Sequence, residues 1–156
     1  METKIIEINA PAHVVWSVLI SRQHYSQKGG YFSSNWQANS VIEWHGIDGR
    51  GNFFGKILRI KPMELFTYIK FDVNQGNKVF SLVSYQTSQL GDKTILKYSE
   101  DLMYPISGIK ERIFRRQIEK HLAIISELAS SVQQTGSLQD NINQLLHTQN
   151  LSYETK

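Results

Sequence analysis

The stretch NWQANSVIEWHG, residues 35–46, carries two of the three tryptophans of this chain, eight positions apart. Between them, Val41 to Trp44 is a short run rich in β-branched and aromatic residues, which is typical of a strand. Ile42 and Trp44 lie two positions apart, so their side chains face the same side of that strand. We expect this side to be the interior of the fold, with Trp36 packing at its rim.

Four more segments of the same character follow, and turn residues come after each of them. The five expected strands are Val41–Trp44, Asn52–Ile60, Glu64–Phe71, Lys78–Gln86 and Thr94–Ser99. Short turns between successive strands predict an antiparallel meander. In the third strand Phe66, Tyr68 and Lys70 share one face, but the other face is also partly apolar. The pattern therefore does not decide which face is inside.

A long amphipathic helix is predicted after the meander, from about Ile109 to Ser131. Apolar residues recur there at helical spacing, and the positions between them are largely charged. The stripe consists of Phe114, Ile118, Leu122, Ile125 and Ala129. A helix with one apolar face has to cover something apolar, and the sheet is the available surface.

The residues before the meander predict one more strand and two short helices. Lys4–Ile8 alternates weakly and ends before Pro11, a residue that suits the first turn of a helix. Asn9 is a candidate cap for that helix. A second short helix is plausible between Ser21 and Gly30, where the chain is polar and then reaches two glycines.

Composition excludes several classes of function. The 156 residues include no cysteine, which excludes disulfides, thiolate metal sites and cysteine nucleophiles, and favours a reducing cytoplasm. No apolar run approaches the roughly 20 residues needed to cross a bilayer, and the first residues do not resemble a signal peptide. The net charge of +3 is small. The basic cluster Lys110–Arg116 fits a solvated helix face better than an anion-binding surface, so we expect no nucleic-acid partner.

The length predicts one domain with a tail. We expect the domain to occupy residues 1–131 and a polar extension to occupy residues 132–156. The extension is rich in glutamine and asparagine, and Leu138–His147 could form a short helix in it. A helix of that length is marginal unless it docks on something, so disorder is the alternative.

Several motifs resemble one known family in the same order along the chain. Residues 8–16, INAPAHVVW, resemble its opening, in which a strand ends and a helix begins with a valine-tryptophan pair. Residues 36–46 resemble its W-x-x-G-S-x-I-x-W-x-G motif, with Asn39 in place of glycine; asparagine tolerates positive φ well. Residues 55–65 and 91–96 resemble its later strand and turn motifs. Tyr104–Ile109 departs from the family, which often opens its last helix with Gly-Trp.

The family is that of the heat-shock-protein ATPase activator homologues, within the START-like, or helix-grip, superfamily. The resemblance covers roughly residues 4–129. It implies an α+β helix-grip fold, in which a curved antiparallel sheet of about six strands wraps around a long C-terminal helix. Two short helices would follow the first strand. It also implies a chaperone or another protein as a possible partner.

Motifs for catalysis and metal binding are absent from the sequence. It has no phosphate-binding loop, dinucleotide fingerprint, zinc-protease motif or nucleophile elbow. The five histidines are scattered, with no pair at helical i, i+4 spacing. Tyr68, Tyr98, Glu100 and His121 are the candidates for acid-base chemistry, but nothing in their spacing requires it. We therefore expect no cofactor, no metal and no catalytic residue.

Three functions remain open: a module that holds a small apolar or amphipathic molecule, a regulator that binds a protein partner, and an enzyme of the cyclase or dehydratase type. The first is the leading hypothesis, because an aromatic sheet under one amphipathic helix can enclose an apolar cavity. The expected wall of that cavity consists of Trp44, Phe54, Ile57, Phe66, Tyr68, Val83, Leu96, Tyr98, Ile118, His121, Leu122 and Ile125.

Overall fold

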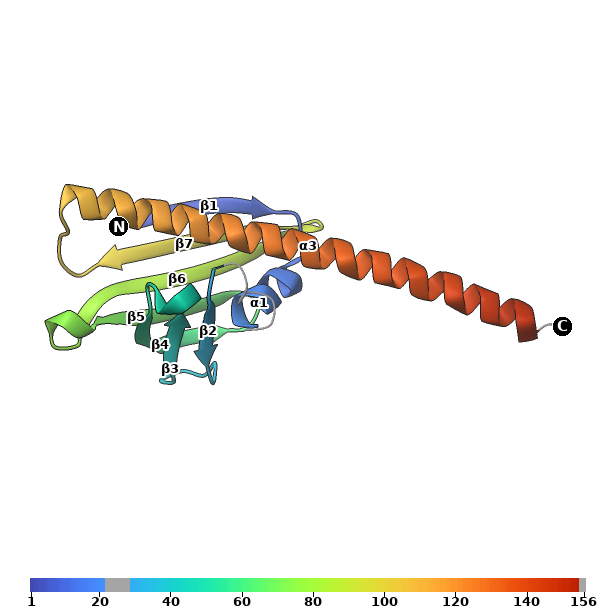
Figure 1. The fold of residues 1–156 in the computed structure, drawn as a ribbon, viewed down its shortest axis with the longest axis horizontal. Helices are drawn as coiled ribbons and strands as arrows, with labels where there is room; N and C mark the ends of the chain where they lie inside the picture. Colours follow the sequence, from blue (N-terminus) through green and yellow to red (C-terminus); the bar gives the residue numbers. More distant parts are fainter. Residues whose placement is uncertain (22–28, 155–156) are drawn as a thin grey trace.

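The computed structural model describes the backbone of residues 1–21 and 29–154, and side chains up to residue 136. The chain folds into one antiparallel sheet of seven strands, a short helix and a long helix (Figure 1). The strands are β1 (Glu2–Ile8), β2 (Tyr31–Ser34), β3 (Val41–His45), β4 (Phe53–Lys61), β5 (Leu65–Asp72), β6 (Lys78–Leu90) and β7 (Lys93–Leu102). The helices are α1 (Ala12–Ile20) and α3 (Gly108–Glu154), and the single turns η1 (Ile47–Gly49) and η2 (Val73–Gln75) join strands.

The sheet is the meander that the sequence predicts. Its strand order is β1-β7-β6-β5-β4-β3-β2, so each strand from β2 to β7 lies beside its neighbour in sequence and β1 closes against β7. The α+β class and the long C-terminal helix are confirmed. The strand that the sequence analysis missed is β2, four residues long. The second short helix, expected between Ser21 and Gly30, falls mostly on residues 22–28 and lies outside the described residues.

The core lies between the inner face of the sheet and the two helices. Alternate residues in parts of β5, β6 and β7 are buried there, including Phe66, Val83 and Leu96. From the helices, α1 contributes Val15 and α3 contributes the apolar stripe. Ile118, Leu122, Ile125 and Ala129 are all buried, as their spacing predicts.

Helix α3 covers the inner face of the sheet unevenly and lies closest to the edge formed by β1. It packs against β1 and α1. Two ion pairs fix it along β1, from Lys4 to Glu119 at 3.3 Å and from Arg115 to Glu2 at 2.8 Å. Inward residues of β3 and β4, such as Trp44 and Phe53, are only partly buried.

The end of α3 differs from the sequence-based expectation. The helix runs without a break to Glu154, so Leu138–His147 belongs to one continuous helix. Among the side chains that the structure describes, which end at residue 136, Val132 is the last on α3 that packs against the core, and Gln134 to Gly136 are exposed. Beyond them the helix projects away from the sheet (Figure 1). The division of the chain into a domain (residues 1–131) and an extension (residues 132–156) stays a prediction.

Candidate functional site

A buried carboxylate lies on the inner face of the sheet, near the end of β7 (Lys93–Leu102). Glu100 on β7 is 1% exposed. Its Oε2 accepts hydrogen bonds from the Ser81 hydroxyl at 2.5 Å and the Lys70 ammonium at 3.2 Å, and its Oε1 accepts one from the Tyr98 hydroxyl. Strand alternation places Tyr98 and Glu100 on one face, and the β5–β6 register places Lys70 opposite Ser81. Three strands therefore supply one polar cluster inside an apolar core.

The ammonium group of Lys70 is held among aromatic rings. It lies 4.4 Å from the centroid of Phe53 and 5.8 Å from that of Phe80. The Lys70 side chain keeps 17% of its surface exposed, far less than a lysine on an open surface. Burying an ion pair is costly, so such a pair inside a small domain often marks a functional site.

A second polar contact joins the sheet to α3. The hydroxyl of Tyr85 on β6 and Nε2 of His121 are 2.6 Å apart. Burial lowers the pKa of His121 to about 3, and the positive charge of Lys70 acts in the same direction. Burial raises the pKa of Tyr98 well above its ordinary value, and the Glu100 carboxylate adds to this. At neutral pH both side chains are therefore uncharged, and the charged members of the interior are Lys70 and Glu100.

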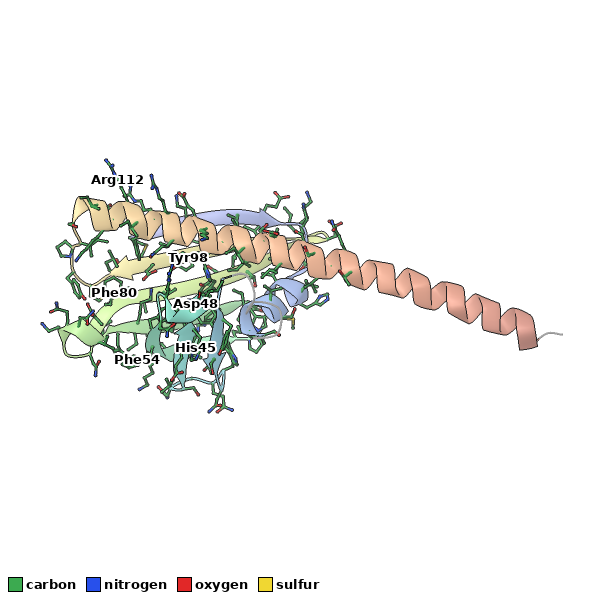
Figure 2. All side chains as sticks on the ribbon, viewed as in Figure 1. His45, Asp48, Phe54, Phe80, Tyr98 and Arg112 are labelled. Atoms are coloured by element: carbon green, nitrogen blue, oxygen red, sulfur yellow. The ribbon has the colours of Figure 1, made fainter. Side chains whose placement is uncertain are left out.

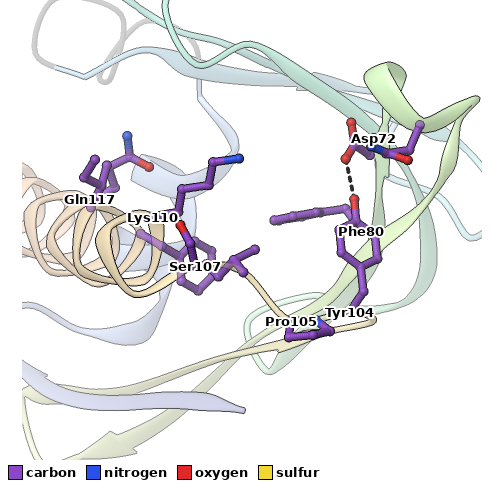
Figure 3. A pocket seen from close by; sticks show the side chains of 11 residues that line it. Asp72, Phe80, Tyr104, Pro105, Ser107, Lys110 and Gln117 are labelled. Atoms are coloured by element: carbon purple, nitrogen blue, oxygen red, sulfur yellow. Dashed lines mark hydrogen bonds between the residues drawn. The ribbon is translucent and has the colours of Figure 1, made fainter.

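A pocket of about 390 Å³ lies between the η2 turn and the first turns of α3 (Figure 3). Figure 3 shows the Phe80 ring beside Tyr104, with Lys110 and Gln117 on the helix across from them. The full lining is Asp72, Gln75, Phe80, Tyr104, Pro105, Ile106, Ser107, Lys110, Ile113, Phe114 and Gln117. Four of these lining residues, Tyr104 to Ser107, belong to the stretch whose sequence departs from the pattern of the family that the chain resembles.

One wall of this pocket is fixed by Asp72 and Tyr104. The Tyr104 hydroxyl donates a hydrogen bond to the Asp72 carboxylate, which also accepts one from the backbone N–H of Asn74 at 3.0 Å. The bond to Asp72 raises the pKa of Tyr104 to about 12, so its hydroxyl stays protonated. The Phe80 ring packs edge-on against Tyr104 at 5.6 Å. The pocket is thus largely preformed on the sheet side.

A second pocket of about 480 Å³ lies at β2 and β3 and includes Trp36, Glu43 and His45 in its lining. Trp36 thus lies at the rim of this pocket, with its ring centroid 6.1 Å from that of Phe32. Residues 22–28, outside the described part, follow soon after Ile20, which also lines this pocket. The pocket at α3 is therefore the better defined of the two.

Most of the twelve residues expected to line a cavity pack in the core. Trp44 and His121 are partly buried and contact each other at 5.3 Å. Phe54, labelled in Figure 2, lies on the opposite face of the sheet, with its ring centroid 5.2 Å from that of Phe71. Phe53 takes the inward position and packs against the core. None of the twelve lines either pocket. The nine that are buried are Ile57, Phe66, Tyr68, Val83, Leu96, Tyr98, Ile118, Leu122 and Ile125.

Sequence reasoning named Glu100 and His121 as polar candidates but missed Lys70, Phe80 and Phe53. The signal for Lys70 was present, because it shares a strand face with Phe66 and Tyr68. Within the described residues, no three histidine, aspartate or glutamate side chains gather as metal ligands would. No described helix is long and apolar enough to cross a membrane.

Comparison with solved structures identifies the fold. Protein MLL2253 from Mesorhizobium loti is 14% identical, with a TM-score of 0.68 over 81% of this chain and 96% of that one. CalU16 from Micromonospora echinospora is 17% identical, with a TM-score of 0.61 over 85% and 83%. The Aha1 dimer from Colwellia psychrerythraea is 13% identical, with a TM-score of 0.64 over 81% and 94%. No family model and no curated protein matches the sequence. The chain therefore shares its fold, the helix-grip arrangement of an antiparallel sheet and a long C-terminal helix, with these proteins.

Proposed function

We propose that the protein binds a small amphipathic molecule in the pocket between η2 and the start of α3. The observation that carries the proposal is the lining, which combines the rings of Phe80, Tyr104 and Phe114 with a few polar and charged side chains. Binding sites for small molecules are mostly apolar concavities with a few polar groups that set orientation. The volume of about 390 Å³ is sufficient for a ligand the size of a fused bicyclic ring.

The arrangement of α3 supports the same proposal. Side chains on the first turns of α3 contact the sheet. One of them is Phe114, whose ring centroid lies 6.5 Å from that of Phe80. Pocket residues on this part of the helix, Lys110 and Gln117, are exposed. A ligand that fills the pocket would bury their aliphatic parts and exclude water from the aromatic wall.

The test is titration of the full chain with acetylnaphthalene, followed by NMR of labelled phenylalanine rings. Binding should shift the signals of Phe80 and Phe114. Gln117→Trp fills the pocket from an exposed helix position and should abolish the shifts. Ile109→Ala is the matched control, since Ile109 is 76% exposed and lies outside the lining. Shifts that persist unchanged in Gln117→Trp would place binding elsewhere and contradict the proposal.

A second candidate function is binding of a protein partner through the projecting part of α3. The observation that favours it is the continuation of the helix past Val132, its last residue packed on the core. A lone helical segment of this length is marginal in water, so a partner would stabilise it. A second copy of the chain is the first partner to test, because the structurally similar Aha1 is described as a dimer. Removal of residues 134–156 should abolish self-association in sedimentation, and an unchanged mass would count against it.

A further inference from the structure

We infer that the ligand is a zwitterion with an aromatic body, such as a free aromatic amino acid, and that its two charges bind to Lys110 and Asp72. This inference rests on the proposed function, because it names the chemistry of the molecule in the pocket between η2 and α3. Three features of the lining support it: two opposite charges, the bonding capacity left on each of them, and the aromatic rings of the pocket wall.

The described lining of this pocket contains one cation and one anion, and they come from different elements. Lys110 lies in the first turn of α3, and Asp72 lies at the end of β5, beside η2. Figure 3 shows the Lys110 side chain extending from the helix towards the wall that carries Phe80 and Asp72. Among the described residues, no carboxylate oxygen lies within 4.0 Å of the Lys110 ammonium nitrogen. The two charges therefore face the same pocket without forming an ion pair with each other.

Asp72 is held in place and can still accept hydrogen bonds. The Tyr104 hydroxyl donates to one of its carboxylate oxygens, and the backbone N–H of Asn74 donates to the other at 3.0 Å. An ionised carboxylate has about four lone-pair sites, so these two bonds leave about half of them unused. The ammonium group of a ligand would therefore gain a charge-assisted hydrogen bond to a carboxylate whose position is already fixed.

Lys110 can bind the negative end of the same ligand. Its ammonium group carries three N–H donors, and it makes no hydrogen bond to another described side chain. The side chain is exposed, and exposed ion pairs are weak, so each charged contact should contribute about threefold in affinity. The two charges would then select among ligands whose affinity comes mainly from the apolar wall.

Aromatic rings supply that wall. The ring centroid of Phe80 lies 5.6 Å from that of Tyr104 and 6.5 Å from that of Phe114. All three side chains are partly buried and line the pocket, so a flat aromatic body can pack against them. A ligand with a single negative charge would be repelled by Asp72, and one with a single positive charge by Lys110. A zwitterion, with both charges on one end of the molecule, finds a partner for each.

Four probes with the same naphthalene body test the inference on the full chain. Naphthylalanine carries both charges, its N-acetyl derivative only the carboxylate, its amide only the ammonium, and its N-acetyl amide neither. Dissociation constants are taken from the NMR signals of the Phe80 ring, so that binding at this pocket is what is measured. Naphthylalanine should bind about tenfold more tightly than the uncharged probe, with each singly charged probe weaker than the zwitterion. Equal binding of zwitterion and uncharged probe, or tightest binding by a singly charged probe, would overturn the inference.

Lys110→Met removes the cation and keeps the aliphatic part of the side chain. In this variant naphthylalanine should bind no more tightly than its amide, because the carboxylate has lost its partner. Lys120→Met is the matched control, since Lys120 is exposed on the same helix but lies outside the lining, and it should keep the difference. A difference that survives in Lys110→Met would overturn the inference.

The outcome for the inference is separable from the outcome for the proposed function. Binding of acetylnaphthalene at Phe80 without binding of naphthylalanine would overturn the inference and leave the pocket as a binding site. A lack of binding by acetylnaphthalene and by all four probes would instead overturn the proposed function.

Discussion

Tyr85 and His121 are joined by a 2.6 Å hydrogen bond that connects the middle of the sheet to α3. The Tyr85 ring also stacks on Phe66 at 4.6 Å, and the His121 ring meets Trp44 edge-on at 5.3 Å. The bond therefore ties the helix to the aromatic part of the core. It also places a histidine where protonation is unfavourable.

Acid should destabilise the protein through His121. Its folded-state pKa of about 3 lies below its ordinary value of 6.5, so between these values the unfolded state binds more protons. Stability is then lost as the pH falls below about 6.5, by about 1.4 kcal/mol per pH unit at most. His121→Gln keeps a polar partner for Tyr85 without titrating. Urea unfolding from pH 6.5 to 4 should show a shallower decline for this variant, and identical slopes would contradict the assignment.

Removing one partner of the Lys70–Glu100 pair should destabilise the protein more than its share of the loss caused by removing both partners together. Lys70→Met leaves a buried carboxylate without its cation, and Glu100→Gln leaves the cation alone. Each single change should lower the free energy of unfolding by about 3 kcal/mol, and the double change by less than the sum. Denaturant unfolding of the four proteins in a double-mutant cycle measures the coupling. Additive losses would show that the pair does not act as a unit.

Leu122→Ala should lower the free energy of unfolding by about 2–5 kcal/mol, because the side chain is 2% exposed and its removal leaves a cavity. Ile109→Ala on the same helix should change it by less than about 0.5 kcal/mol, since Ile109 is 76% exposed. Chemical denaturation compares the two. Similar losses would mean that α3 does not pack on the sheet as described.

Gly55→Ala should be strongly destabilising although Gly55 lies in a regular strand. A Cβ atom there would come 2.0 Å from the carbonyl oxygen of Ile69, so the backbone of β4 or β5 would have to move. We expect a loss of more than about 2 kcal/mol. Gly136→Ala is the control, because a Cβ meets nothing within 4 Å there and alanine favours the helix by about 1 kcal/mol. Thermal unfolding followed by circular dichroism should separate the two variants.

Much of the fold was predictable because its signals are local. The turns between strands predicted the meander, and the spacing of Ile118 and Leu122 predicted which face of α3 is buried against the sheet. Asn39, which replaces a family glycine, has φ of 70°, in agreement with the tolerance of asparagine for that region. β2 was missed because it is four residues long and ends in Ser33 and Ser34, which are poor strand signals.

The candidate site was less predictable because it depends on faces and distant pairs. Both faces of β5 carry apolar residues, so the inward direction of Lys70 became clear only from its bond to Glu100, thirty positions away. Adjacent Phe53 and Phe54 look equivalent in sequence but lie on opposite faces. Asn9, which we expected to cap α1, makes no side-chain hydrogen bond to the described residues at the start of this helix. Instead, Oε1 of Gln89 accepts a hydrogen bond from the backbone N–H of Ala12 at 2.7 Å. Such a cap, 77 positions away, leaves no local pattern.

The continuous helix makes the last part of the chain a lever with a glycine at its base. Gly136 follows Val132, the last of the described side chains that packs on the core, and the eighteen residues after it, up to Glu154, span about 27 Å at 1.5 Å per residue. A tilt of only about 10° at that glycine would swing the tip by about 5 Å while the sheet stays still. A small change of direction at this position would therefore become a large displacement of anything held at the tip.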